Sequence, residues 1–244
     1  MRYALLAALL CVPPSAVAAD ADFDINCTPP AGCQAAFAAV IKDASAALGY
    51  KALGPAEATG LTGFGAGAMV SYVAVNDQQA WQTLTGTKVD EIGMAGVVVH
   101  KGLPFGIDLG AFYSTIPGAD VDVYGGELRY ALLEGGVASP GLALRASYTT
   151  TQGLDDFDYE AWGLDLSVSK GFAFVTPYVG VGYSLSTADP RSADAQAAGL
   201  REVEVDQGRI FAGVRLALLI LELTPEYQRQ GDADVYSLRF GFSF

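Results

Sequence analysis

The C-terminal three quarters of the chain alternate apolar and polar residues, and this period of two limits the possible folds more than any other feature. Side chains alternate between the two faces of a β-strand, so alternation that persists from Leu61 onward predicts strands. The clearest case is the C-terminus, where every second residue is large and apolar. The residues on this face are Tyr236, Leu238, Phe240, Phe242 and Phe244.

Ten segments share this alternation, and most are near the roughly 9 to 11 residues that a tilted strand needs to cross a bilayer. Unpaired backbone groups in hydrocarbon are costly, so a sheet embedded in lipid has to close on itself. The sequence therefore predicts an all-β fold over residues 61–244, an antiparallel transmembrane β-barrel of about ten strands. The segments are 64–72, 92–98, 105–113, 124–132, 142–148, 162–169, 175–185, 210–218, 219–227 and 236–244.

The first residues predict export. Arg2 precedes the apolar run 4–12, and the small residues 16–19 suit a signal peptidase. The run is too short for a membrane helix, which needs about 20 residues. We therefore expect a signal peptide over residues 1–19. Export also favours the barrel over a soluble β-sandwich, which alternates in the same way.

Residues 20–60 follow a different pattern and predict a periplasmic helical segment with a connector. Apolar residues recur at helical spacing between Phe37 and Leu48, Gly49 follows as a stop, and Thr28-Pro29-Pro30 resembles a cap with proline in the first turn. Three positions for this helix stay open: a plug in the lumen, a contact with the periplasmic rim or a periplasmic partner, and a simple leader to the first strand.

Cys27 and Cys33 form an even pair in a chain that we expect to be exported. Disulfides persist in oxidising compartments. The sequence therefore predicts one disulfide that closes a small loop, with two free thiols as the alternative.

Charged residues on the inward face of the predicted barrel number ten, five acids and five arginines. Two interpretations stay open: a structural network of ion pairs, since an unpaired charge beside low-dielectric walls is costly, or a constriction that selects small solutes by charge. The ten residues are Asp108, Glu127, Arg129, Arg145, Asp165, Arg209, Arg215, Glu222, Glu226 and Arg239.

Other chemistry finds little support. The net charge of -13, from 27 acidic and 14 basic residues, excludes a nucleic-acid partner. An acidic loop at Asp155, Asp156, Asp158 and Glu160 lacks the ligand spacing of a calcium loop. We expect a solvated acidic loop there, with no metal site and no cofactor.

The terminal segment that ends on Phe244 resembles the assembly signal of Gram-negative outer-membrane β-barrel proteins. The resemblance implies location in the outer membrane, contact with its lipids and lipopolysaccharide, and insertion by the barrel-assembly machinery with Phe244 as a contact. It also implies a narrow passive pore or a structural barrel, with surface binding or adhesion through the extracellular loops as the alternative.

Enzymes among such barrels rely on histidine, and His100 is the one histidine of this sequence. We expect His100 to lie at a strand end as an interface or turn residue, and we expect no catalytic residues.

Overall fold

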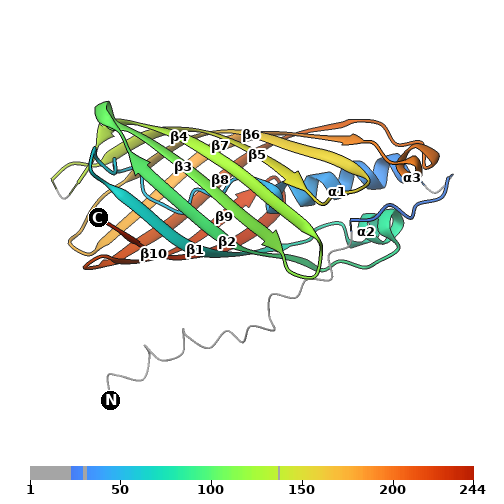
Figure 1. Ribbon diagram of the computed structural model, residues 1–244, viewed down its shortest axis with the longest axis horizontal. Coiled ribbons are helices and arrows are strands. Elements are labelled where there is room, and N and C mark those ends of the chain that lie inside the picture. The colour runs from blue at the N-terminus through green and yellow to red at the C-terminus, as the bar shows by residue number, and fades with distance from the viewer. Residues whose placement is uncertain (1–22, 30–31, 137) are drawn as a thin grey trace, which may run out of the picture.

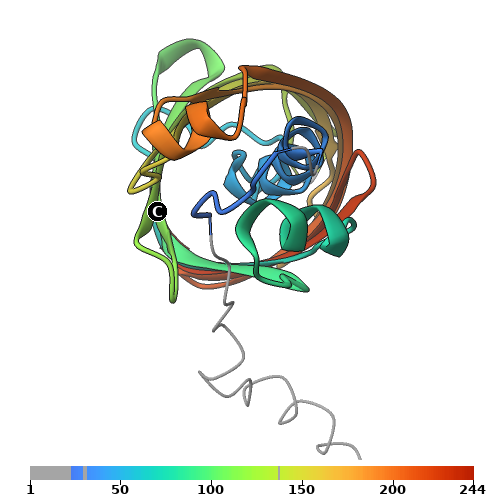
Figure 2. The same ribbon diagram turned by 90° about the vertical axis from the view of Figure 1, so that its right-hand side faces the viewer.

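The computed structural model describes residues 23–29, 32–136 and 138–244. Over these residues the chain forms ten strands that close into one barrel, in which each strand is antiparallel to its neighbours in the sequence and β1 pairs with β10 (Figures 1 and 2). The predicted ten-stranded antiparallel barrel is confirmed. The strands are β1 (Phe64–Ala74), β2 (Glu91–Gly102), β3 (Ile107–Ile116), β4 (Val121–Glu134), β5 (Gly141–Gln152), β6 (Phe157–Ser169), β7 (Val175–Pro190), β8 (Val203–Leu218), β9 (Leu221–Gln230) and β10 (Ala233–Ser243).

Several strands extend further than predicted, and β1, β5, β6, β7, β8 and β9 do so mainly toward the end of the barrel where β7 finishes and β8 starts. β7 and β8 each have 16 residues, whereas the sequence predicted strands over 175–185 and 210–218. The added residues of β8 alternate buried Val203 and Val205 with exposed Glu204 and Asp206. The outward face is acidic there rather than apolar, which hides the strand from a search for lipid-facing residues.

The two ends of the barrel differ in their connections. The end where β1 starts and β10 finishes, here the turn end, carries the connections 103–106, 135–140, 170–174 and 219–220. The opposite end, here the loop end, carries 75–90, 117–120, 153–156, 191–202 and 231–232.

Short helices lie in three of these connections. The 3₁₀ turn η2 (Pro104–Gly106) is at the turn end, and α2 (Gln78–Thr85) and α3 (Ala193–Ala197) are in the two longest loops. The sequence analysis missed α2 and α3, although their caps were visible, since Asp77 and Ser192 each accept a hydrogen bond from a backbone N–H three residues later. Within the described residues, no helix is long and apolar enough to cross a membrane.

The N-terminal segment lies inside the barrel. Helix α1 (Cys33–Leu48) occupies the lumen at the loop end (Figures 1 and 2), and residues 49–63 continue through the lumen to β1 at the turn end. Of the three positions that the sequence left open for this helix, the structure shows the first, a plug in the lumen. The predicted cap at Thr28 was wrong, because the helix begins after Gly32, whose φ of 77° is left-handed. Its predicted end at Gly49 is confirmed.

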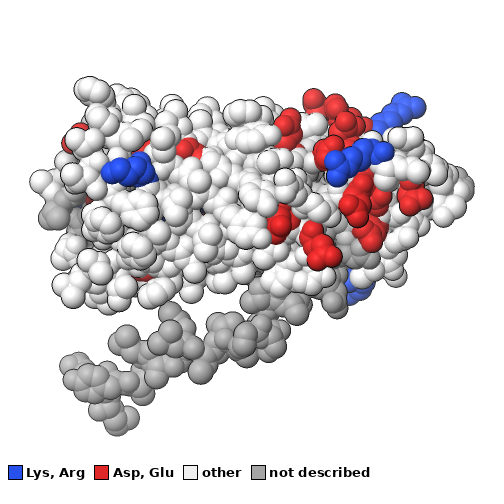
Figure 3. Space-filling view, viewed as in Figure 1, with Lys and Arg blue, Asp and Glu red and all other residues white. Residues whose placement is uncertain are grey.

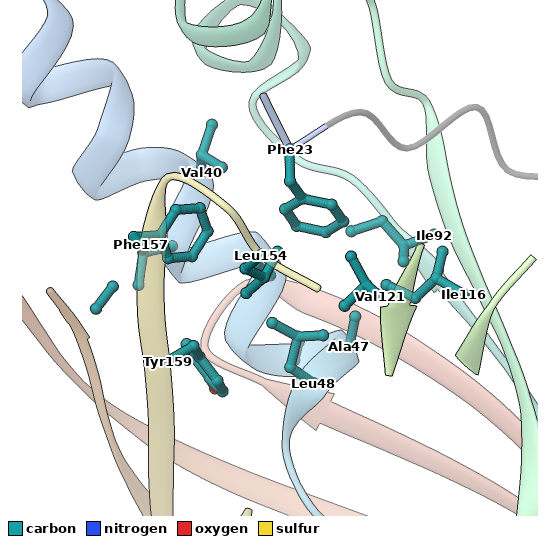
Figure 4. Close-up of a cluster of buried hydrophobic side chains, with 14 of the residues drawn as sticks. Phe23, Val40, Ala47, Leu48, Ile92, Ile116, Val121, Leu154, Phe157 and Tyr159 are labelled. Atoms are coloured by element: carbon teal, nitrogen blue, oxygen red, sulfur yellow. The ribbon is translucent and has the colours of Figure 1, made fainter. Parts of the chain in front are cut away.

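The loop-end half of the lumen is an apolar core around α1 (Figure 4). Phe37, Val40, Ile41 and Leu48 of the helix are fully or almost fully buried. Inward-facing residues of the strands surround them, and Phe37 meets Phe157 edge to face at 5.4 Å between ring centres. These strand residues are Val73, Ile92, Met94, Ile116, Val121, Val123, Phe157, Tyr159, Val205 and Val235.

The predicted disulfide is confirmed, since Cys27 and Cys33 are bonded. It closes the loop immediately before α1, at the loop end of the barrel.

Candidate functional site: a charged lumen filled by the N-terminal segment

The turn-end half of the lumen is charged, in contrast to the apolar half around α1. Nine of the ten residues that strand parity assigned to the lumen are buried there, and the tenth, Arg215, has a side chain that is 25% exposed. The structure therefore brings the whole set together on the inner wall. What surrounds each charge decides what the set can do.

The centre of this set is a chain of ion pairs across four strands. Arg145 on β5 lies 2.5 Å from the Glu127 carboxylate on β4, measured from its Nε atom. Its Nη1 atom is 3.9 Å from Asp165 on β6. Asp165 in turn accepts two hydrogen bonds of 2.6 Å from Arg209 on β8. Their mutual attraction offsets part of the cost of taking these charges out of water.

Further pairs lie closer to the turn end. Arg129 donates two hydrogen bonds, of 3.1 and 2.8 Å, to Asp108. Arg239 and Arg215 both approach Glu222, at 3.5 and 3.8 Å. Glu226 differs from the other four acids, because its hydrogen-bond partners are neutral: the Tyr178 hydroxyl at 2.7 Å and the Leu53 backbone N–H at 2.9 Å.

The same charged side chains hold the backbone of residues 49–63. These residues form neither helix nor strand, so their buried N–H and C=O groups need other partners. Three arginines donate to carbonyl oxygens of this segment: Arg209 to Tyr50, Arg239 to Leu53 and Arg129 to Pro55, at 2.9 to 3.3 Å.

Acceptors on the barrel wall serve the N–H groups in the same way. The Asp108 carboxylate accepts from the Thr59 N–H at 3.1 and 3.2 Å, and the Ser169 hydroxyl accepts from the Ala56 N–H at 3.1 Å. The lumen charges are thus a cradle for an irregular segment as well as a network of pairs.

Glycines on the inner wall make room for these side chains. A Cβ atom at Gly182 would lie 1.9 Å from an Asp165 oxygen, and one at Gly163 would lie 2.7 Å from Arg209. At Gly67 it would meet the Arg239 Nε atom at 3.1 Å. The alternating glycines of β1 therefore serve the packing of charges, as small lumen-facing residues do in narrow barrels.

Sequence reasoning missed two members of the site. His100 lies near the end of β2, as predicted, but it is not a turn or interface residue, because its side chain is buried in the lumen with the Nε2 atom 3.3 Å from Glu127. The sequence carried a signal for this position, because His100 follows Val98 by two residues and so lies on the same, buried face of the strand. Glu57 of the N-terminal segment lies 2.6 Å from Arg215, and no periodic pattern marks it.

The open space in the charged half is small. A cavity of about 210 Å³ at the turn end is lined by Arg129, Arg215, Arg239, Glu222 and His100, and by the N-terminal segment at 54–59. No group of three or more His, Cys, Asp and Glu side chains is placed to hold a metal ion among the described residues.

The outer wall of the barrel is apolar around its middle, and charged side chains gather toward the loop end (Figure 3). A repeated contact marks the boundary: in four of the five hairpins joined at the loop end, a tyrosine of the first strand donates a hydrogen bond to an acid of the second. The pairs are Tyr113 with Asp122, Tyr148 with Glu160, Tyr183 with Asp206 and Tyr227 with Asp234.

The predicted assembly signal lies on this outer wall. Tyr236, Phe240, Phe242 and Phe244 are exposed and Leu238 is half-buried. The backbone of Phe244 exchanges hydrogen bonds of 2.8 and 3.0 Å with Phe64, so the last residue takes part in closing the barrel between β1 and β10.

Comparison with known proteins gives a similarity of fold. No family model and no curated protein matches the chain. The N-terminal β-barrel domain of Pseudomonas aeruginosa OprF is 15% identical with a TM-score of 0.38, over 76% of this chain and 99% of that one. OprG from the same organism is 13% identical with a TM-score of 0.36, over 78% and 99%.

The outer membrane protease OmpT of Escherichia coli is 10% identical with a TM-score of 0.36, over 74% of this chain and 94% of that one. All three structures are similar to this chain as barrels, at identities that carry nothing beyond the fold.

Proposed function

We propose that the protein is a closed, non-enzymatic structural barrel of the Gram-negative outer membrane. The observation that carries this proposal is the filled lumen: α1 occupies the apolar half, and residues 49–63 are bonded to the charged half. A passive pore needs a continuous polar path. Here the inner wall at the loop end is apolar and is covered by the helix.

The energy of this packing supports a permanent plug rather than a movable gate. Burying one large apolar side chain contributes about 1.5–3 kcal/mol. Phe37, Val40, Ile41 and Leu48 together therefore contribute on the order of 6–12 kcal/mol by the same measure. Withdrawing α1 would forfeit this and wet an apolar wall as well. The ten lumen charges then serve as structural pairs and as a cradle, rather than as a filter.

The outer wall supports a position in the membrane. Its apolar middle suits lipid, and the ring of tyrosines toward the loop end suits the interface with headgroups. Bacterial barrels place short turns in the periplasm and long loops outside. We therefore assign the loop end to the cell surface, in contact with lipopolysaccharide. The exposed terminal face with Phe244 is the assigned contact for the barrel-assembly machinery during insertion.

The absence of catalysis is part of the same proposal. His100 is buried in the charged half of the lumen against Glu127, and α1 separates it from the loop end. A general base has to reach its substrate within hydrogen-bond distance. This position gives His100 a structural role as a partner of Glu127.

A conductance measurement tests the closed state. The folded protein in a planar bilayer is expected to give no steady current steps, while a known general porin in the same chamber does. Folding is checked on a gel by a change in mobility on boiling. Regular current steps from the folded protein would overturn the closed barrel and restore the reading of the ten charges as a filter.

Surface binding is the second candidate, and the ordered loop end favours it. The Gln34 side chain exchanges two hydrogen bonds with the Arg201 backbone, which ties α1 to the loop 191–202 between β7 and β8. Replacing residues 191–202 by a short glycine-serine turn is expected to leave the barrel folded. Adhesion of whole cells to host-cell layers would be lost if this loop is the binding surface, and it would be unchanged if it is not.

A further inference from the structure

The N-terminal segment enters the barrel at the loop end, and its first described residues are fixed there. The Phe23 ring packs edge to face on Trp81 of α2, with ring centres 5.3 Å apart. Asn26 hydrogen-bonds the last turn of α2 twice: its N–H to the Leu84 carbonyl at 2.9 Å and its side chain to the Thr85 carbonyl at 3.1 Å. The N-terminal segment therefore enters the lumen at the loop end, opposite the turn end where β1 starts.

Contacts along the segment follow the barrel axis in order. Asp43 of α1 accepts hydrogen bonds from the backbone N–H groups of Asn76 and Asp77 in the first loop. Ser45, further along the helix, bonds Gln207 of β8. Thr59 then reaches Asp108 at the start of β3, at the turn end. The segment therefore runs the length of the lumen before β1 turns back.

This path is hard to reverse once the barrel has closed. The second half of α1, Asp43–Leu48, is wholly buried in the lumen, and the disulfide between Cys27 and Cys33 makes the chain wider just ahead of the helix than an extended chain. Since β1 and β10 pair along their length, the wall leaves no lateral exit. The segment has to be in the lumen before the β1–β10 seam forms.

We infer that this barrel carries its own N-terminus across the outer membrane and displays it on the cell surface, together with the loop closed by Cys27 and Cys33. This inference rests on the proposed function for the direction of the barrel only. The sequence analysis expected the helical segment in the periplasm. By this inference it instead spans the outer membrane inside the barrel, with its N-terminal end at the cell surface.

The test is an epitope tag inserted between Asp22 and Phe23 of the full chain, detected by antibody on intact cells. Two matched insertions report the direction of the barrel: one in the loop 231–232 and one in the turn 219–220. The expected result is that the N-terminal and 231–232 tags give the same signal before and after lysis, whereas the 219–220 tag gives a signal only after lysis.

The two failures are distinguishable. An N-terminal tag that is silent on intact cells, beside a 231–232 tag that is detected, overturns the crossing and leaves the direction intact. A 219–220 tag detected on intact cells overturns the direction itself.

If the N-terminal tag blocks folding, single cysteine substitutions test the same inference. Ala35 is exposed at the start of α1, and Leu219 is fully exposed in the turn 219–220. Ala35→Cys is expected to react with a membrane-impermeant maleimide on intact cells, and Leu219→Cys is not. The reverse pattern would refute the display of this segment.

Discussion

Replacing Phe37 with alanine tests whether α1 belongs to the core of the barrel. Phe37 is 0% exposed, and its ring meets Phe157 of β6 edge to face. Removing a buried phenylalanine side chain typically costs about 3–5 kcal/mol, through lost burial and the cavity left behind. Of this, about 0.5–1.5 kcal/mol belongs to an aromatic pair of this geometry. We expect Phe37→Ala to lower the free energy of unfolding by a value in the upper part of that range, because rigid strands surround the site.

The assay is urea unfolding of the protein folded in detergent micelles, followed by tryptophan fluorescence and by mobility on an unboiled gel. Phe105→Ala is the matched control, because the same side chain is 89% exposed there, and exposed substitutions usually change stability by less than about 0.5 kcal/mol. Equal stability of the two variants would refute the reasoning, since it would mean that α1 leaves the lumen without cost.

Two further predictions concern the charged half, with unfolding measured in the same way. Arg209→Met leaves Asp165 buried without its bidentate partner and is expected to cost about 3–5 kcal/mol. Arg229→Met is the control, because the ion pairs of Arg229 are exposed and their loss is expected to cost less than about 1 kcal/mol. Similar losses of unfolding free energy in the two variants would contradict a structural role for the lumen charges. Gly182→Ala is expected to prevent or strongly weaken folding, because its Cβ would lie 1.9 Å from Asp165, whereas Gly208→Ala meets nothing within 4 Å. A stable Gly182→Ala barrel would show that the network yields easily.

The barrel itself was predictable because alternation survives wherever one face meets an apolar surface. The parity that puts Phe240 outside puts Arg239 inside, and the same rule placed Arg145 and Asp165 on one inner wall. The physical rule is local, so it needs no knowledge of the other residues.

What lies in the lumen was not predictable from the same rule. The spacing of Phe37 and Ile41 identifies an apolar helix face but not what covers it, so three positions stayed open. Glu57 carries no periodic signal, because it lies in an irregular segment whose path depends on its partners. The burial of His100 was missed because the predicted second strand stopped at Val98, two residues before it.

Hydrogen exchange of the backbone amides in residues 49–63 tests most directly whether the N-terminal segment fills the lumen. An irregular coil in water exchanges quickly, whereas an amide bonded inside a closed barrel opens only with the surrounding structure. The amides of Leu53, Ala56 and Thr59 are bonded to Glu226, Ser169 and Asp108. The account predicts that these three amides exchange as slowly as those of the central strands. Exchange as fast as in the loop 231–232 would contradict it.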